Sequence, residues 1–374
     1  MPRPSDTAPH PSPARHDRSL FRRRAVRSVL ALGVAAGALA AAGAAFAQAP
    51  PTLPAFDQEP YTHPQRLVAI APGRRLNLYC TGHGAPAVIL DSGWGGPTTA
   101  WAYVQPAVSA FTEVCSYDRA GQGFSDPGPL PRDTRALVSD LHALLHKAGI
   151  RPPYILVAHS LGGLDGVMFA DRYRSELAGM LLVDPAFAHQ GREMSHIPGI
   201  DAVMKQTNPD LKPCEAAARA HRLPTTPQLV DLCLSHDPSY TPALVSALDA
   251  MALRPEYWSD VASETASFES GPGSTRNDLD SRELDAAARG FGALPLIVLT
   301  AGDRIALPGI TPAQADAEFA VWKHGHDVIS ARSAQGRNQV VPNTSHYIQF
   351  YQPATVIAAI HELVDRSGRK PGKG

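Results

Sequence analysis

The sequence predicts an α/β fold, in which a mostly parallel β-sheet is covered by helices on both faces. Short apolar runs alternate along the chain with stretches of helical periodicity, which is typical of such a sheet. Runs such as Ala87–Asp91 and Tyr154–Ala158 are apolar almost throughout, as expected of strands buried on both faces. With 374 residues, 44% of them hydrophobic and 18% charged, the chain can form one large domain with an extensive core.

The first two strands are predicted to form a hairpin, Leu67–Ala71 and Leu76–Cys80, around the turn Pro72-Gly73-Arg74. Asp133–Gly149 is the clearest helix, because leucines recur in it at helical spacing and Asp133 or Thr134 can cap its start. The other expected strands are Ala87–Asp91, Glu113–Tyr117, Tyr154–Ala158, Met180–Val183, Leu296–Thr300 and Asn338–Val341. The other expected helices of the core are Val104–Phe111, Leu161–Tyr173 and Thr355–Val364.

The stretch between Asp184 and Pro295 breaks this alternation. It has no clear β run, and its helical pieces include Lys212–His221, Thr226–Ser235 and Thr241–Ala252. We therefore expect residues 185–294 to form a helical lid inserted into a core made of residues 65–184 and 295–366. Glu269–Ser274, rich in Ser and Gly, is expected to be a mobile loop in this lid, and residues 367–374 a disordered tail.

The N-terminus is typical of an export signal. A basic stretch around Arg22-Arg23-Arg24 precedes an uncharged run from Val29 to Ala47, which ends in small residues before Gln48. We expect residues 1–47 to be a cleaved signal peptide, by the Sec or the twin-arginine route, and residues 48–64 to be a Pro-rich tether with little structure. The mature protein would then be periplasmic or secreted, without a stable membrane partner. The alternative is an anchor, since the run is almost long enough to span a bilayer.

The charge balance excludes one class of partner and leaves others open. The formal net charge is -1 and the body of the chain has no long basic stripe, so nucleic-acid binding has no electrostatic support. No cofactor is implied by any motif, and a metal site formed by the cysteines is disfavoured because no CxxC spacing occurs. The oligomeric state is left open by the sequence.

The strongest chemical signal is Ile155-Leu-Val-Ala-His-Ser-Leu-Gly-Gly163, where a buried strand runs directly into a helix with Ser160 at the junction. Small neighbours, Ala158, Gly162 and Gly163, suit a very tight turn. The motif resembles the G-x-S-x-G nucleophile elbow of α/β hydrolases, with Ala in place of the first Gly. Such a turn exposes the serine hydroxyl and places the Leu161 N–H where it can bind an oxyanion. His159 is interpreted as a packing residue.

A serine hydroxyl needs a base, and the base needs an orienting acid. His346, just after the last expected strand, is the predicted base; His324, His326 and His361 lie within helical stretches. Asp303, at the end of Pro295–Asp303, is the predicted acid. Asp184, at the end of the earlier strand Met180–Asp184, is the alternative, because some members of this fold take their acid from that strand.

A second oxyanion donor is expected from the glycine-rich loop Asp91-Ser-Gly-Trp-Gly-Gly96. Trp94 is the residue whose N–H should point inward, and its indole could also line an acyl pocket. The alternative is a tight turn packed by an aromatic side chain. A phosphate-binding loop is disfavoured because the Gly-Lys-Ser/Thr ending is missing.

Together these motifs resemble bacterial exported esterases of the α/β-hydrolase superfamily. The similar motifs are Tyr79-Cys-Thr-Gly82, the loop at Asp91–Gly95, Cys115–Asp126, the elbow, and Thr344-Ser-His-Tyr347, within a match from Gln65 to Val364. The resemblance implies a mostly parallel eight-stranded sheet with the lid between strands six and seven. Asp118 and Arg119 are expected to hold loops together. The chain departs from many relatives in having Ala158 and no His before Gly93.

The resemblance also bears on the four cysteines, which allow three pairings in an oxidising compartment. In this fold the second and fourth strands are neighbours, which favours a Cys80–Cys115 disulfide. Cys214 and Cys233 both fall in the lid and would close a short loop.

The activity implied by the resemblance is hydrolysis of a small-molecule carboxylic ester, or a similar acyl compound, through an acyl-enzyme. Ser160 disfavours dehalogenases and epoxide hydrolases, which need a carboxylate nucleophile at that position. Carbon–carbon bond hydrolases, aminopeptidases and cofactor-free peroxidases use the same residue types and stay open, as does a catalytically silent binding protein. The acyl group and its chain length are not specified by the sequence.

Overall fold

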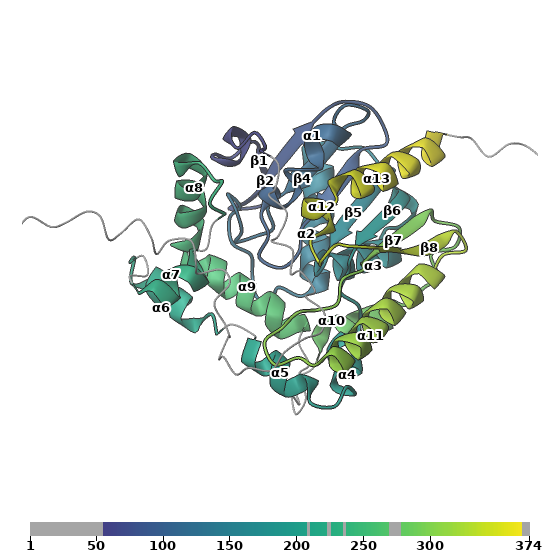
Figure 1. Cartoon of the computed structure of the whole chain (residues 1–374). Helices are drawn as coiled ribbons and strands as arrows, with labels where there is room; N and C mark the ends of the chain where they lie inside the picture. The colour runs from purple at the N-terminus through teal and green to yellow at the C-terminus, as the bar shows by residue number, and fades with distance from the viewer. Residues whose placement is uncertain (1–54, 208–209, 223–225, 235–236, 269–277, 369–374) are drawn as a thin grey trace, which may run out of the picture. The chain divides into compact units, whose positions relative to one another are not determined.

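A computed structural model describes residues 55–207, 210–222, 226–234, 237–268 and 278–368 of the chain. Its centre is one eight-stranded sheet with the order β1-β2-β4-β3-β5-β6-β7-β8 (Figure 1). β2 is antiparallel to both of its neighbours, and all the other pairs are parallel, which confirms the predicted sheet. The strands are β1 (Leu67–Ala71), β2 (Arg74–Thr81), β3 (Val88–Asp91), β4 (Val114–Tyr117), β5 (Tyr154–His159), β6 (Leu177–Val183), β7 (Leu296–Ala301) and β8 (Gly336–Val341).

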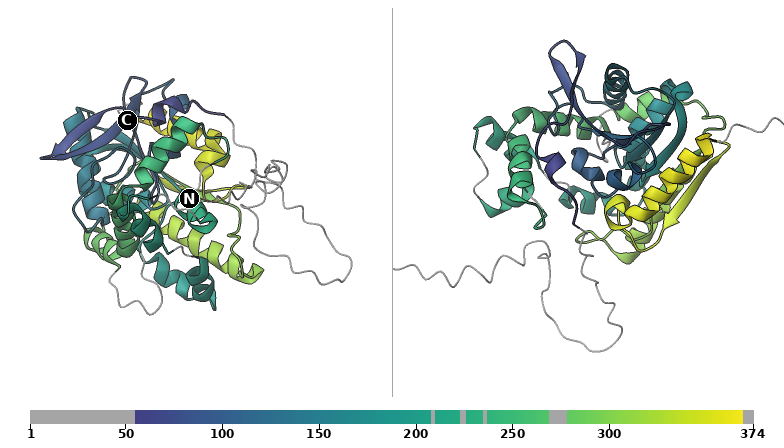
Figure 2. Two further views of the ribbon diagram at one scale, coloured as in Figure 1. Left: turned by 90° about the vertical axis from the view of Figure 1, so that its left-hand side faces the viewer. Right: turned by 90° about the horizontal axis from the view of Figure 1, so that it is seen from above.

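Helices cover both faces of this sheet because its central strands are apolar on both sides. In β5, Leu156 packs into the apolar layer beneath α2, α3 and α11, whereas Ile155 and Val157 pack into the layer beneath α1 and α13. α13, drawn in yellow, lies along one side of the sheet in the right-hand view of Figure 2. These helices are α1 (Gln105–Val108), α2 (Thr134–Ala148), α3 (Gly162–Arg172), α11 (Pro312–Ala331), α12 (Ile348–Tyr351) and α13 (Pro353–Gly368).

One expected helix is shorter than predicted. Instead of a helix over Val104–Phe111, the chain forms a 3-10 turn at Thr98–Trp101 and the single turn α1. The chain after Val108 is held against the end of β2: a Cβ atom on Gly82 would lie 2.5 Å from the Ser109 carbonyl oxygen. The Thr112 hydroxyl also donates to the Pro86 carbonyl oxygen, so the backbone turns here and does not continue as a helix.

The segment between β6 and β7 is helical in its described residues, as expected. Its second half, α6 to α10, lies beside the edge of the sheet at which β5 and β6 end (Figure 1). The helices are α4 (Gln190–Ser195), α5 (Ile200–Thr207), α6 (Lys212–Arg219), α7 (Pro227–Cys233), α8 (Pro242–Ala252), α9 (Pro255–Phe268) and α10 (Leu279–Ala287). Glu269–Ser274 lies outside the described residues.

Two disulfides join the four cysteines in the predicted pairs. Cys80 and Cys115 lie directly opposite each other in the β2–β4 ladder and are bonded. Cys214 in α6 is bonded to Cys233 in α7. Disulfides are typical of extracellular and periplasmic proteins. Of the helices that the structure describes, none has the length and apolar character needed to cross a membrane.

The expected tether at residues 48–64 is structured from residue 55 onward, so the prediction of little structure there is wrong for its second half. Phe56 contacts the rings of Tyr61, Tyr103 and Tyr240 edge to face, and Tyr61 is 5% exposed. Burial of these aromatic side chains outweighs the local preference of the prolines for an extended chain. The signal segment at residues 1–47 lies outside the described residues, and so do residues 369–374 of the expected tail.

Candidate active site

Ser160 lies in a sharp turn between β5 and α3. Its φ is 54°, in the left-handed region that a non-glycine residue rarely adopts. The Ser160 N–H donates to the Val183 carbonyl oxygen of the neighbouring strand, and its own carbonyl oxygen accepts from the N–H groups of Gly163 and Ala186. A Cβ atom on Gly162 would lie 2.7 Å from the Ser92 carbonyl oxygen. The small residues of the motif are therefore required by close backbone approach.

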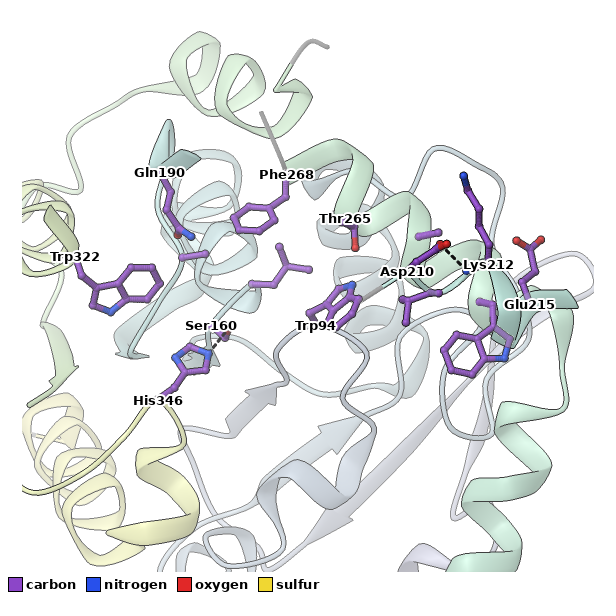
Figure 3. Close-up of a pocket in the computed structure, with 15 residues that line it drawn as sticks. Trp94, Ser160, Gln190, Asp210, Lys212, Glu215, Thr265, Phe268, Trp322 and His346 are labelled. Atoms are coloured by element: carbon purple, nitrogen blue, oxygen red, sulfur yellow. Dashed lines mark hydrogen bonds between the residues drawn. The ribbon is translucent and has the colours of Figure 1, made fainter. Parts of the chain in front are cut away.

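His346 brings the serine and one carboxylate together. Its Nε2 lies 2.9 Å from Ser160 Oγ (Figure 3), and its Nδ1 lies 2.7 Å from Asp184 Oδ2. The other Asp184 oxygen, Oδ1, accepts from the Ala301 N–H at 2.8 Å and from the Trp322 indole N–H at 2.9 Å. Since a carboxylate only accepts, His346 Nδ1 carries the proton and Nε2 is free to accept the serine proton.

Burial by itself would raise the pKa of Asp184, which is 3% exposed. The hydrogen bond with His346, the electrostatic effect of His346 and His326, and the Ala301 N–H together outweigh burial. The pKa of Asp184 is lowered as a result, so this carboxylate is ionised at neutral pH. An ionised, fully bonded carboxylate can hold the imidazole in one tautomer and stabilise an imidazolium.

The predicted acid, Asp303, does not hold His346, and the alternative, Asp184, does. Asp303 follows β7, where its backbone N–H donates to the Thr344 carbonyl oxygen, and its side chain is exposed. β6 lies between β5 and β7 in the sheet, so the end of β6 is the one next to the Ser160 turn. In the sequence, Asp184 is marked by its position at the end of the buried strand Met180–Asp184. Asp303 has the same kind of position after its own apolar strand, so this pattern does not distinguish the two carboxylates.

His159 is a buried neighbour of the catalytic candidates, as interpreted from the sequence. Its Nε2 lies 3.1 Å from the His346 carbonyl oxygen, which can only accept, so Nε2 carries the proton. Burial, followed by repulsion from His346, lowers the pKa of His159 to about 3. A neutral His159 therefore packs beneath His346 and holds its backbone, and it carries no charge into the site.

The loop after β3 approaches Ser160 closely enough to offer backbone donors. A Cβ atom on Gly93 would lie 3.0 Å from Ser160 Cβ and 2.9 Å from His159 Nδ1, so a side chain there would clash. Among the described residues, the backbone N–H groups of Trp94 and Leu161 have no hydrogen-bond acceptor. Both candidate oxyanion donors are therefore available beside the serine.

Arg119 fixes the loop after β3 through hydrogen bonds to its backbone. It donates from Nη1 to the Ser92 carbonyl oxygen at 2.9 Å and from Nη2 to the Gly93 carbonyl oxygen. The guanidinium is 2% exposed and lies 3.5 Å from Asp91, 3.3 Å from Asp165 and 3.4 Å from Glu264. Burial would lower its pKa, but the charges of Glu264, Asp91 and Asp165 raise it, so Arg119 stays a cation. The predicted role of Arg119 in joining loops is thus seen in its contacts.

Asp118 joins loops in the same way. Its carboxylate accepts from the backbone N–H groups of Thr98 and Phe124 and from the Asn77 side chain, at 2.8, 3.0 and 2.8 Å respectively.

The lid helix α9 is tied to the same loop by two contacts that the sequence did not predict. Glu264 of α9 pairs with Arg119 and accepts from Gln122 Nε2 at 2.9 Å. The Trp94 indole N–H donates to the carbonyl oxygen of Val261, also in α9, at 3.1 Å. No local pattern marks Glu264, because a carboxylate on an amphipathic helix is normally solvated.

A cavity of about 440 Å³ opens over Ser160 and His346. Figure 3 shows Trp94 and Phe268 near the serine, with Trp322 and Gln190 on one side and Asp210, Lys212 and Glu215 at the far end. A second cavity, of about 270 Å³, shares Ser160, His346 and Trp94 and is lined by Tyr240, Tyr347 and Phe350. The site therefore has two compartments that meet at the serine.

Four leucines of the lid helices line neither cavity: Leu229, Leu232, Leu244 and Leu248. Leu244 is fully buried against Tyr61 and Ala102 with Leu248 beside it, and Leu229 and Leu232 pack around the Cys214–Cys233 disulfide. The lid residues that line the larger cavity come mainly from α6 and α9. These four leucines are buried by their own helices against the rest of the lid and against the core, so they do not form the wall of a substrate pocket.

Comparison with known proteins places this architecture in a large family. The alpha/beta hydrolase family matches residues 81–359. An uncharacterized protein, YbdG, of Bacillus subtilis is 28% identical over 120 residues, which are 32% of this chain and 37% of that protein. A putative carbamate hydrolase, RutD, of Escherichia coli is 32% identical over 151 residues, 37% of this chain and 55% of that protein. The chain thus spans little more than half of these relatives at most.

Solved structures agree on the fold. A putative lipase from Acinetobacter baumannii is similar with a TM-score of 0.53 and 14% identity, over 83% of this chain and 94% of that one. A putative epoxide hydrolase from Pseudomonas aeruginosa is similar with a TM-score of 0.52 and 16% identity, over 79% and 93%. Since the family match covers most of the residues and the sheet order and the turn at Ser160 agree with it, the chain belongs to the alpha/beta hydrolase family.

Proposed function

We propose that this hydrolase cleaves carboxylic esters of small molecules through an acyl-enzyme formed on Ser160. The observation that carries the proposal is the pair of short contacts on one imidazole, 2.9 Å from His346 Nε2 to Ser160 Oγ and 2.7 Å from Nδ1 to Asp184. Nucleophile, base and orienting acid are thus in hydrogen-bond reach in the order that activates a serine.

In the first half of the reaction, Ser160 Oγ attacks the ester carbonyl carbon while His346 Nε2 takes the hydroxyl proton. The carbonyl oxygen becomes an oxyanion, which the backbone N–H groups of Trp94 and Leu161 would stabilise. Asp184 stabilises the imidazolium through the Nδ1–H bond. The tetrahedral intermediate then collapses, the bond to the alcohol oxygen breaks, and His346 gives its proton to the leaving alcohol.

In the second half, water attacks the acyl carbon and gives a proton to His346 Nε2. Collapse of this second intermediate breaks the bond to Ser160 Oγ, returns the proton to that oxygen and releases the carboxylic acid. Every step uses groups of this chain, the substrate and one water molecule, so atoms and protons balance without a cofactor.

Labelling with a fluorophosphonate probe, followed by peptide mapping, tests the nucleophile directly. Hydrolysis of nitrophenyl acetate, butyrate and octanoate tests the reaction. Labelling at Ser160 together with ester turnover would support the proposal. Labelling without turnover of any ester would redirect the search to amides, carbamates, carbon–carbon bonds or peroxide chemistry, which the same residues can serve. No labelling would indicate a silent binding protein.

We also propose that the enzyme acts outside the cytoplasm after removal of residues 1–47. The two disulfides and the basic-then-apolar N-terminus support this. N-terminal sequencing of the exported protein should begin at or near Gln48. Retention of the full N-terminus in a membrane fraction would favour the anchored alternative.

A further inference from the structure

The edge of the sheet opposite Ser160 has a cluster of three side chains that the proposed reaction does not use. His142 and His146 lie one turn apart near the end of α2, and Glu176 ends the short helix η4 (Arg174–Glu176) just before β6. Ser160 and Asp184 follow the carboxyl ends of β5 and β6. Since β6 runs from Leu177 to Val183, the cluster lies about 25 Å from Asp184 along the strand.

The donor atoms of this cluster converge on one point. His142 Nε2 lies 3.0 Å from Glu176 Oε1 and 3.0 Å from His146 Nε2. His146 Nε2 lies 3.5 Å from Glu176 Oε2. Tetrahedral ligands of Zn²⁺, with bonds of about 2.0–2.1 Å, are separated by roughly 3.3 Å. The observed separations of 3.0, 3.0 and 3.5 Å are close to this value, and one ligand atom from each of the three residues lies within 4.8 Å of the others, so each residue can supply one ligand to the same ion.

Hydrogen bonding alone does not satisfy this arrangement. A neutral imidazole nitrogen either carries a proton or accepts one, so His142 Nε2 cannot donate to Glu176 and also accept from His146. Glu176 Oε2 is buried and has no hydrogen-bond partner among the described residues. A cation at the centre would accept lone pairs from both imidazoles and from the carboxylate at once.

The ligands are also held in place before any ion binds. The His142 ring stacks on Tyr173 at 3.7 Å with an interplanar angle of 5°. Glu176 is 20% exposed and His146 is 50% exposed, so the fourth coordination position faces solvent and can take a water molecule. The four cysteines of the sequence are all bonded in the two disulfides, so no thiolate competes for the ion.

We propose that His142, His146 and Glu176 form a binding site for a divalent transition-metal ion, with Zn²⁺ as the ion of choice. Two imidazoles and a carboxylate are ligands that Zn²⁺ accepts readily. The ion would join the end of α2 to the start of β6. Because that edge is remote from Ser160, its role is to stabilise the fold and not to take part in hydrolysis.

The test uses the mature enzyme, freed of metal with EDTA and titrated with zinc sulfate in neutral buffer. Calorimetry should show one ion per chain, and saturating zinc should raise Tm by several degrees, since a ligand that binds only the folded state stabilises it. His146→Ala and Glu176→Gln should each weaken binding more than about tenfold, since even an outer-shell change costs that much. Both variants should keep ester hydrolysis.

His361→Ala is the matched control, because His361 is a half-exposed helical histidine that pairs with a single carboxylate, Asp365 at 3.4 Å, among the described residues. It should bind zinc as the unaltered enzyme does. Each variant's Tm without zinc shows whether it is folded. The proposal is overturned if the unaltered enzyme shows no zinc-dependent rise in Tm, or if His146→Ala and Glu176→Gln bind zinc as tightly as it does.

Discussion

The indole N–H of Trp94 donates to the carbonyl oxygen of Val261 at 3.1 Å, and so joins the loop beside Ser160 to the lid helix α9. Glu264, one turn further along α9, pairs with the buried Arg119, which donates hydrogen bonds to the backbone of the same loop. The lid and the proposed oxyanion loop therefore form one hydrogen-bonded unit. We expect changes in α9 to alter the position of this loop beside Ser160.

Glu264→Gln should lower kcat by about tenfold with a smaller change in KM, because a displaced oxyanion donor weakens transition-state binding most. Affinity for a boronic acid, which forms a tetrahedral adduct on serine, should fall in parallel. Glu256→Gln changes an exposed carboxylate of the same helix and should have little effect. If Glu264→Gln lowers Tm while kcat and boronate affinity stay unchanged, Glu264 only stabilises the lid.

Ser160→Ala should abolish ester hydrolysis, by about 10⁴-fold or more, while the protein stays folded. The hydroxyl is the only group removed, and the backbone of the turn is held by bonds to Val183, Gly163 and Ala186. Hydrolysis rates and the circular dichroism spectrum check both halves of the expectation. More than about a tenth of the original activity would take Ser160 out of the mechanism.

Asp184→Asn should cost orders of magnitude in kcat, because a carboxamide in place of the carboxylate can present an N–H donor to His346 Nδ1 and favours the wrong tautomer of His346. Asp303→Asn, which changes an exposed side chain, should cost at most a few-fold. The two variants are compared in one assay on a short nitrophenyl ester. A larger loss in Asp303→Asn would mean that His346 changes its partner during the reaction.

Ala262→Phe should shift preference toward shorter acyl chains, since Ala262 lines the 440 Å³ cavity together with Phe268 and Thr265. Hydrolysis of the acetate ester should stay nearly unchanged, while hydrolysis of the octanoate ester should fall about tenfold or more. A loss of this size is typical when methylene groups of a substrate no longer fit an apolar pocket. Ala266→Phe, an exposed position of α9 outside that lining, is the control. An equal loss on all chain lengths would place the acyl group in the smaller aromatic cavity.

Asp280 makes the contact between the lid and the core sensitive to pH. Burial raises its pKa to about 7, helped by the charges of Asp133 and Glu283, although it accepts from the Thr134 N–H at 2.7 Å. The unfolded pKa is about 4, so the folded state holds the proton more tightly. The contribution of Asp280 to the free energy of unfolding is therefore complete below about pH 4 and is lost as the pH rises through about 7.

Tm of the unaltered enzyme should therefore fall more steeply between about pH 5 and pH 8 than Tm of Asp280→Asn, which cannot ionise. Thermal unfolding across that range measures the difference between the two curves. Parallel curves would mean that Asp280 is ionised throughout, held by the Thr134 N–H at the start of α2.

Local sequence was sufficient for much of this protein. The Ser160 turn, the position of His346 after the last strand and the buried strands were predicted from short patterns, because a tight turn and a doubly buried strand each require particular residues within a few positions. The Cys80–Cys115 and Cys214–Cys233 pairs, given by the resemblance, also agree with the structure.

Long-range packing decided the rest. Asp184 and Asp303 both end buried strands, and nothing local distinguishes them. The difference comes from β6 lying next to β5 and from the Trp322 and Ala301 N–H groups that hold Asp184 beneath His346. The Glu264–Arg119 pair likewise joins residues 145 positions apart in the chain. A buried charge is stabilised only by partners that the fold brings to it, and those partners become visible only once the tertiary structure is known.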